Sequence, residues 1–224
     1  MFTKQFRNSL IWTGILALAA VGEVREPLIC RWSPRDPGST VVSRNGVNFL
    51  SLASRGVTVE TTVEDTGREM RIDLRIQNQS EGSIPIDPAG FAFQVESPKA
   101  KQLKFELAEN VAGRALAIAS SMDPMGNGAT FNRTAQSAGN GAAEHEAARI
   151  LQTALRSGSL PPGQAIAGAV YFERQKKKEE TLLRVPVGKM VFEFPFTWSG
   201  GRVVDARISP VDAIGHGSGV RLGQ

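Results

Sequence analysis

The chain has 224 residues, of which 41% are hydrophobic and 21% charged, a composition typical of a globular protein with one sizeable core. Its single cysteine, Cys30, excludes an intramolecular disulfide. The formal net charge is +4, and it becomes about +2 without Lys4 and Arg7, which lie in the expected N-terminal signal peptide described below. This small net charge gives no reason to expect a nucleic-acid partner.

Residues 1–22 have the pattern of a secretory signal peptide. Lys4 and Arg7 form a basic start, and the stretch Ser9–Val21 is apolar apart from two hydroxyl residues. The end of this stretch, Ala20-Val21-Gly22, has small residues at both positions that a signal peptidase recognises. The alternative is a retained membrane anchor, but a spanning helix needs about 20 apolar residues and this run is shorter. We therefore expect cleavage near Gly22, export to the periplasm, cell surface or medium, and no stable membrane span afterwards.

Residues 23–40 contain three prolines and little periodicity, so we expect a lead-in segment in which Trp32 is a possible anchor. Cys30 lies in this segment, too far from the expected cleavage site for a lipid anchor and not preceded by small residues. Strands are expected from Val41 onward.

Alternation of apolar and polar residues predicts two strands over residues 57–63 and 70–76, joined by a loop of hairpin length. The outward faces carry glutamates on the first strand and arginines on the second, which favours cross-strand pairing. Residues 78–90 are rich in turn signals, and another short alternating strand is expected over residues 91–95.

The pattern changes over residues 97–159, where apolar side chains recur at helical spacing. The first stripe is Leu103, Leu107, Val111, Ala115 and Ile118, and the second is Ala147, Ile150, Leu151, Ala154 and Leu155. Ser97 followed by proline resembles an N-cap and the first position of a helix. Residues 122–142 are rich in Gly, Asn, Ala, Ser and Thr, and we expect a flexible loop there. Residues 143–156 then predict a short amphipathic helix. The sequence therefore predicts an α-helical insertion between the two halves of a β structure.

Residues 160–198 predict three antiparallel strands in a meander. Apolar residues occupy every second position in three consecutive segments separated by turn residues, so their side chains share one dry face. The apolar set is Ile166, Gly168, Val170, Phe172, Leu183, Val185, Val187, Met190, Phe192, Phe194, Phe196 and Trp198. We expect a mainly β protein, an antiparallel β-sandwich over residues 41–198, followed by a flexible Gly-rich tail over residues 199–224.

Three of these segments resemble uncharacterised exported bacterial proteins that carry an immunoglobulin-like (Ig-like) β-sandwich. They are the entry Leu160-Pro161-Pro162-Gly163-Gln164, the strand Gly168–Phe172, and the hairpin from Leu183 to Phe196. The resemblance covers about residues 41–198 and implies an Ig-like antiparallel β-sandwich in the cell envelope. It implies no catalytic or ligand residues, and the helical insertion departs from the plain sandwich.

No sequence pattern predicts a catalytic, cofactor-binding or metal-binding residue. The cluster Glu144-His145-Glu146 lacks the second ligand at helical spacing that a zinc site needs. His216 lies in the tail near Ser218, which has no Gly-x-Ser-x-Gly elbow around it. Gly126-Asn127-Gly128 and Gly139-Asn140-Gly141 lack the strand, lysine and helix signals of a phosphate loop.

Other polar features have plain structural interpretations. The basic run Arg174–Lys178 predicts a solvated hairpin tip whose positive charge is balanced by the two glutamates that follow it. The alternative interpretation, a binding patch for acidic polymers or lipid headgroups, is less favoured. The sequons Asn78-Gln79-Ser80 and Asn132-Arg133-Thr134 are glycosylation acceptors only where the organism modifies them.

These features lead to one main hypothesis: a non-enzymatic, exported Ig-like domain that acts through its surfaces as an adhesive, scaffold or accessory component of the envelope. Its expected partner is another envelope protein. The alternative is a small-molecule or lipid carrier with a pocket between the sandwich and the helical insertion. A hydrolase with dispersed carboxylates is a third hypothesis and requires two acids that converge in a cleft. The sequence leaves the oligomeric state open.

Overall fold

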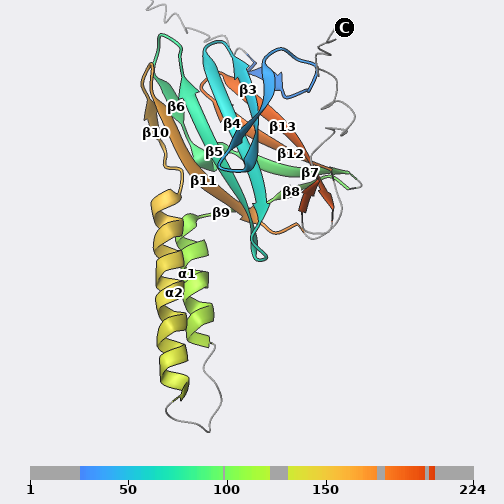
Figure 1. Ribbon diagram of the computed structural model, residues 1–224. Helices are drawn as coiled ribbons and strands as arrows, with labels where there is room; N and C mark the ends of the chain where they lie inside the picture. The colour runs from blue at the N-terminus through green and yellow to red at the C-terminus, as the bar shows by residue number, and fades with distance from the viewer. Residues whose placement is uncertain (1–25, 98, 122–130, 176–179, 200–201, 205–224) are drawn as a thin grey trace, which may run out of the picture.

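The computed structural model describes residues 26–97, 99–121, 131–175, 180–199 and 202–204. The expected signal peptide and residues 205–224 of the expected tail lie outside these ranges. Within them the chain is mainly β, with two α-helices and with strands that pair antiparallel except for one parallel pair (Figure 1). No helix in the described ranges is long and apolar enough to cross a membrane.

The first sheet, called the β5 sheet below, is antiparallel and has the strand order β2-β3-β4-β5-β11-β9 in the described residues. Its strands are β2 (Ser39–Arg44), β3 (Val47–Ser54), β4 (Val57–Asp65), β5 (Glu69–Asn78), β11 (Ala165–Glu173) and β9 (Phe105–Glu106). The hairpin predicted over residues 57–76 is confirmed as β4–β5. Between β2 and β3, Asn45 and Gly46 have φ angles of 52° and 78°, as a tight two-residue hairpin turn requires.

The second sheet, called the β13 sheet, has the order β1-β13-β12-β7-β8 in the described residues, and β14 also pairs with β13. Its strands are β1 (Leu28–Arg31), β7 (Ala92–Ser97), β8 (Lys101–Leu103), β12 (Glu180–Val187), β13 (Met190–Ser199) and β14 (Arg202–Val204). β1 runs parallel to β13, and the other pairs are antiparallel. A separate short ribbon pairs β6 (Ile84–Ile86) with β10 (Gly158–Leu160), and a single 3₁₀ turn, η1 (Pro88–Gly90), follows β6.

Both sheets contribute to one hydrophobic core. The β5 sheet supplies Leu50, Leu52, Val59, Met70, Ile72, Ile76, Val170 and Phe172, and the β13 sheet supplies Phe93, Val95, Leu103, Leu183, Val185, Phe192, Phe194 and Phe196. Period-two alternation is thus confirmed for the core of each sheet. The expected single meander is wrong in one respect. β11 pairs with β5, whereas β12 and β13 pair with each other in the other sheet.

The ends of the described chain contain more strand than the sequence indicates. The lead-in segment includes β1, and Trp32 is confirmed as an anchor because it is 3% exposed and its Nε1 donates to the Thr40 carbonyl at 3.3 Å. The sequence does not predict β1, because a four-residue strand with three prolines near it shows no alternation of apolar and polar residues. At the other end, Arg202–Val204 forms β14, so the expected loss of strand after Ser199 is wrong there.

Two helices, α1 (Ala108–Ser121) and α2 (Phe131–Thr153), pack against each other and are called the helical hairpin below. Their contact consists of Val111, Ala112, Ala115, Ala147 and Ile150, together with Ala169 and Tyr171 of β11. The hairpin stands away from the sheets and touches them only at its foot (Figure 1).

The helix limits differ from those expected. Residues 101–106 form strands β8 and β9, so a helix does not follow Ser97. The sequence places Leu103 on a helical stripe, but this residue is buried in the sheet core opposite Phe93. The loop expected over residues 122–142 is wrong from Phe131 onward, where α2 begins.

Both ends of the hairpin are attached to β11. Glu106 pairs with Tyr171 just before α1, and Ala154 forms a parallel bridge with Ala169 just after α2. The returning chain lies very close to β11, because a Cβ added to Gly168 would be 2.7 Å from the backbone Cα of Leu155. Glycine is therefore required at this strand position by close backbone approach.

The side chain of Asn78 joins three segments at the far end of β5. Its Nδ2 donates to the carbonyls of Gly82 and Leu160 at 2.8 and 2.9 Å. Its Oδ1 accepts from the backbone N–H and the hydroxyl of Ser80 at 2.9 and 2.6 Å. Asn78 is fully buried, so a glycan on the first sequon would have to displace these bonds.

Candidate functional site

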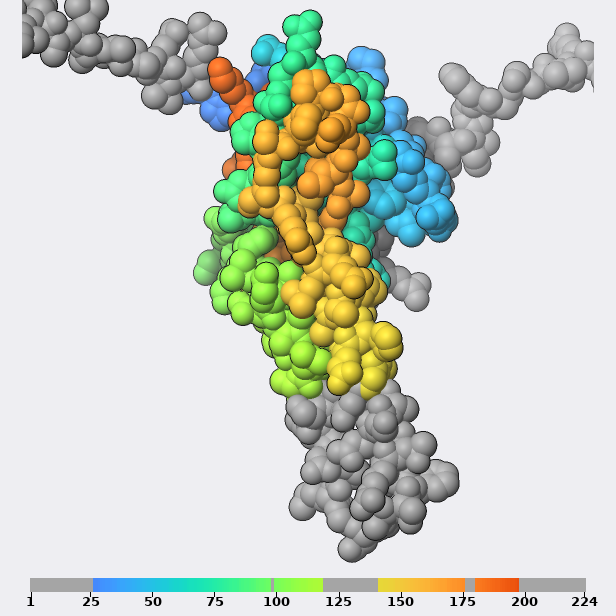
Figure 2. All heavy atoms as spheres, turned by 90° about the vertical axis from the view of Figure 1, so that its left-hand side faces the viewer, coloured from blue at the N-terminus to red at the C-terminus, as the bar shows by residue number. Residues whose placement is uncertain are grey.

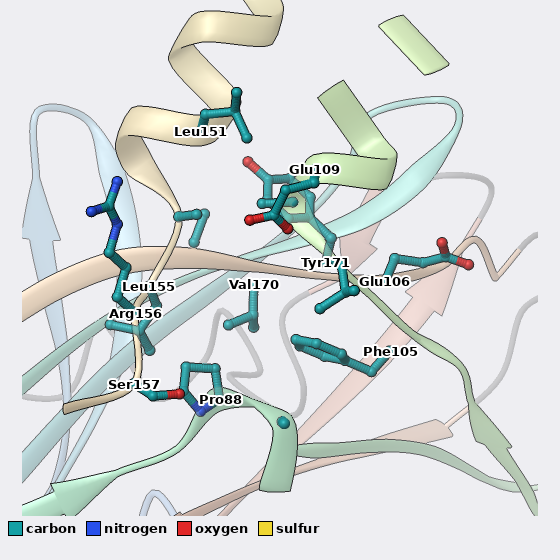
Figure 3. A pocket seen from close by; sticks show the side chains of 15 residues that line it. Pro88, Phe105, Glu106, Glu109, Leu151, Leu155, Arg156, Ser157, Val170 and Tyr171 are labelled. Carbon is teal, nitrogen blue, oxygen red and sulfur yellow. The ribbon is translucent and has the colours of Figure 1, made fainter. Parts of the chain in front are cut away.

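A groove of about 470 Å³ lies at the foot of the helical hairpin, between the helices and the sheets (Figure 3). Phe105, Leu155 and Val170 form its floor. Figure 2 looks onto the same face, where the two helices lie side by side below the sheets. This is the region in which the carrier hypothesis expected a pocket.

Chain geometry creates the groove. α1 begins immediately after β9, and α2 ends where Ala154 meets β11, so the two helices leave the sheet beside each other. Ala108, Ala154 and Ala169 line the groove and have only methyl side chains, which leaves space between the helix ends and the strand. The groove therefore results from small residues at the point where the hairpin joins the sheet.

The walls of the groove carry exposed leucines. Leu107 on the α1 side is 54% exposed, and Leu151 on α2 is 40% exposed. Both belong to the apolar stripes that predict the two helices, and the apolar stripe of a helix normally faces a core. The groove therefore has an apolar side chain exposed on each of its two walls.

Two charged side chains face each other across the groove. Glu109 lies on the α1 side, and Arg156 lies on the α2 side (Figure 3). Both are exposed, and within the described part of the chain neither has a hydrogen bond or ion pair through its side chain. By contrast, Glu106 accepts a hydrogen bond from Arg114 at 3.0 Å, so that acid already braces α1 against the sheet.

Tyr171 lies under the hairpin. Its ring packs in the helix contact, and its hydroxyl is buried without a hydrogen-bonding partner of good geometry among the described residues. Burial raises the pKa of this hydroxyl, and Arg71 and the nearby Thr153 hydroxyl act in the opposite direction. The neutral phenol is therefore the form that this site favours.

A second depression of about 450 Å³ lies on the outer face of the β5 sheet, beside the end of α2. Arg44 makes two hydrogen bonds to Glu60, and Arg71 makes two to Asp73. The sequence predicted different partners: Glu60 stands opposite Arg75 in the register, but its ion pair is with Arg44. The charges of these two pairs are largely satisfied within the depression.

The histidine and acidic residues that the sequence analysis considered as metal ligands or catalytic groups do not come together in the described part of the chain. Glu144 and His145 are exposed on α2, and Glu146 pairs with Arg149 on the same helix. No group of three His, Cys, Asp or Glu suited to a metal ion occurs among the described residues. His216, Ser218 and the segment Gly126-Asn127-Gly128 lie outside them, whereas Gly139-Asn140-Gly141 lies within α2.

The remaining candidates have structural roles. Arg174 makes a two-pronged ion pair with Asp65, with Nε–Oδ1 at 2.7 Å and Nη2–Oδ2 at 2.9 Å, while residues 176–179 lie outside the described chain. Cys30 is a free, half-buried thiol against the core. Phe192, Phe194 and Phe196 are buried in the core, and Phe196 also borders a surface depression beside Trp32.

The groove itself was not predicted residue by residue. Leu107, Glu109, Leu151 and Arg156 come from positions far apart in the sequence, and only the fold brings them together. Comparisons with protein-family models, with curated proteins and with solved structures found no match for this chain.

Proposed function

We propose that this chain is an exported, non-enzymatic Ig-like β-sandwich that serves in the cell envelope as an interaction module, with the helical hairpin as its contact arm. The observation that carries the proposal is the hairpin itself, which extends away from the sheets and exposes leucines at its foot (Figure 1). A helical pair that only stabilised the sheets would lie across them and bury these side chains.

The strand order supports the Ig-like assignment. One sheet of an immunoglobulin domain has the order A-B-E-D and the other C-F-G. Both orders match when β4, β5, β9 and β11 are taken as strands A, B, D and E, and β7, β12 and β13 as strands C, F and G. In this assignment the helical hairpin is an insertion between strands D and E. The signal-peptide pattern of residues 1–22 supports export.

Site-specific photo-crosslinking tests the contact arm. A photoreactive amino acid at His145, exposed on the hairpin, is expected to crosslink one envelope protein in living cells. The matched control is the same amino acid at Gln102, exposed on β8, which is expected to give no such product. Equal labelling from both positions, or none from His145, would refute the hairpin as the contact arm.

Export has its own test. The protein recovered from the envelope or medium is expected to begin at Glu23, which N-terminal sequencing measures directly. A protein that remains in the cytoplasm with Met1 intact would contradict export.

A carrier is the second candidate because the groove lies where that hypothesis places its pocket. Carriers bury most of their ligand, whereas Leu107 and Leu151 are both at least 40% exposed, which favours surface docking. Titration with a fluorescent long-chain fatty acid separates the two. Saturable binding that Leu151→Glu abolishes, and that Val47→Glu at a remote exposed strand position does not, would favour the carrier.

A further inference from the structure

Beyond the groove, one flank of the helical hairpin carries a further exposed leucine on α1. Leu116 follows Glu109 by seven residues, two helical turns, and therefore lies on the same face of α1, where it is 43% exposed. By the same spacing, Glu144 lies on the face of α2 that carries Leu151. The flank thus presents Leu107, Leu116 and Leu151 along two adjacent helices.

Two charges on this flank, those of Glu109 and Arg156, are placed so that a rotated copy complements them, whereas Glu144 has no opposite charge facing it among the described residues. Arg156 lies on the α2 side of the groove, three residues after that helix ends, and Glu109 lies on the α1 side in its first turn, so both are near the foot of the hairpin (Figure 3). Rotation of a second molecule by 180° about an axis parallel to the hairpin places its α2 over the first molecule's α1. Each Arg156 then meets Glu109 of the other copy.

We propose that two copies of this chain pair flank to flank through their helical hairpins, parallel to each other, in an isologous two-fold dimer. The seam would contain the three leucines from each copy, and two Glu109–Arg156 ion pairs would close it at the foot. An isologous interface must be self-complementary, and this flank offers both the apolar surface and the two opposite charges in matching positions. Neither charged side chain has a competing partner in the described chain.

The inference deepens the proposed function and rests on it, since it takes the hairpin as the contact arm and names a second copy as one occupant. The opposite flank of α2, with Glu146 and Arg149, remains outside the seam and accessible to an envelope partner. In the dimer the leucines at the foot are covered by the second copy, so the envelope partner is expected on this opposite flank and near His145. The dimer and the crosslink at His145 are measured separately, so each can fail without the other.

Sedimentation velocity on protein purified from cells that express the full chain tests the dimer. We expect a concentration-dependent shift to twice the chain mass. Leu151→Glu is expected to raise the dissociation constant by at least about tenfold, because it places a charge in an apolar seam. Val47→Glu, at a remote position that is 46% exposed, is the matched control and is expected to leave the dimer unchanged.

A charge exchange tests the geometry itself. Glu109→Arg alone and Arg156→Glu alone are each expected to weaken the dimer by about tenfold, because each brings like charges together. The double variant restores both pairs and is expected to recover most of the lost affinity. Both substitutions are at exposed sites, and circular dichroism checks that each of the three variants remains folded.

Three outcomes would overturn the proposal: a protein that stays monomeric at about 200 µM, well above ordinary dimer affinities; a dimer that Val47→Glu disrupts as strongly as Leu151→Glu; or a double variant no tighter than either single variant. A monomer whose His145 position still crosslinks to an envelope protein would overturn the dimer and leave the proposed function standing.

Discussion

Asn78 gives the sharpest test of how the fold is held together. Its buried side chain makes four hydrogen bonds that connect the end of β5 with Gly82 before β6 and with Leu160 at the end of β10. Each such bond contributes about 0.5–1.5 kcal/mol, and a buried carbonyl left without a donor costs about 1–3 kcal/mol. We therefore expect Asn78→Ala to lower the free energy of unfolding by about 3–5 kcal/mol.

A second substitution separates the hydrogen bonds from the volume of the side chain. Asn78→Asp keeps the shape and the acceptor for Ser80, but it replaces the Nδ2 donor with an oxygen that faces two carbonyl oxygens. Its loss of stability at neutral pH is expected to equal or exceed that of the alanine variant. Gln79→Ala, next along the chain and exposed, is the control and is expected to change the free energy by less than about 0.5 kcal/mol.

Urea denaturation followed by tryptophan fluorescence and circular dichroism measures these changes. The slope with urea should stay constant while the midpoint falls. An Asn78→Ala variant within about 1 kcal/mol of Gln79→Ala would show that the three segments are held by other contacts and that the reasoning is wrong.

Three further changes can be tested in the same assay. Gly168→Ala is expected to destabilise the protein by about 2–3 kcal/mol because the added Cβ meets the Leu155 backbone. Gly113→Ala, with open space around it in α1, is the control and should stabilise the protein by about 0.5–1 kcal/mol. A change of stability in the same direction for both variants would contradict the close approach at Gly168. Tyr171→Phe is expected to leave stability unchanged or raise it by about 1 kcal/mol, since the buried hydroxyl makes no good hydrogen bond. A clear loss of stability in this variant would show that the hydroxyl is hydrogen-bonded in the folded protein. Because burial raises the pKa of Tyr171, the unfolded chain loses this proton first, so stability should fall as the pH rises above about 10, and the fall should be smaller in Tyr171→Phe.

The strands that the sequence predicts best are those with long alternation. β4, β5 and β11–β13 show it because one face of each meets the shared core. The β2–β3 turn also has a signal in the sequence, since Asn45-Gly46 is the dipeptide that favours a tight hairpin turn. The assignment of β11 to the other sheet has no local signal, because it depends on pairing with β5 about ninety residues earlier.

The errors near the helices have a physical cause. Leu103 fits a helical stripe, but pairing of β8 with β7 places it opposite Phe93 in the core, and this tertiary contact overrides local spacing. The first half of α2 is rich in Gly and Asn, which favour turns, yet it continues a helix whose later residues pack against α1. The groove depends on which flank of the hairpin stays uncovered, and periodicity carries no information about that.

The attachment of the hairpin to β11 affects how the chain can vary. Because Glu106 and Ala154 pair with positions two residues apart on one strand, the excursion through both helices returns almost to its starting point. Loop-closure entropy grows only slowly with length, so whole helical turns added to or removed from the distal end should leave the β5–β11 register intact. The reach of the arm can therefore evolve independently of the body that carries it.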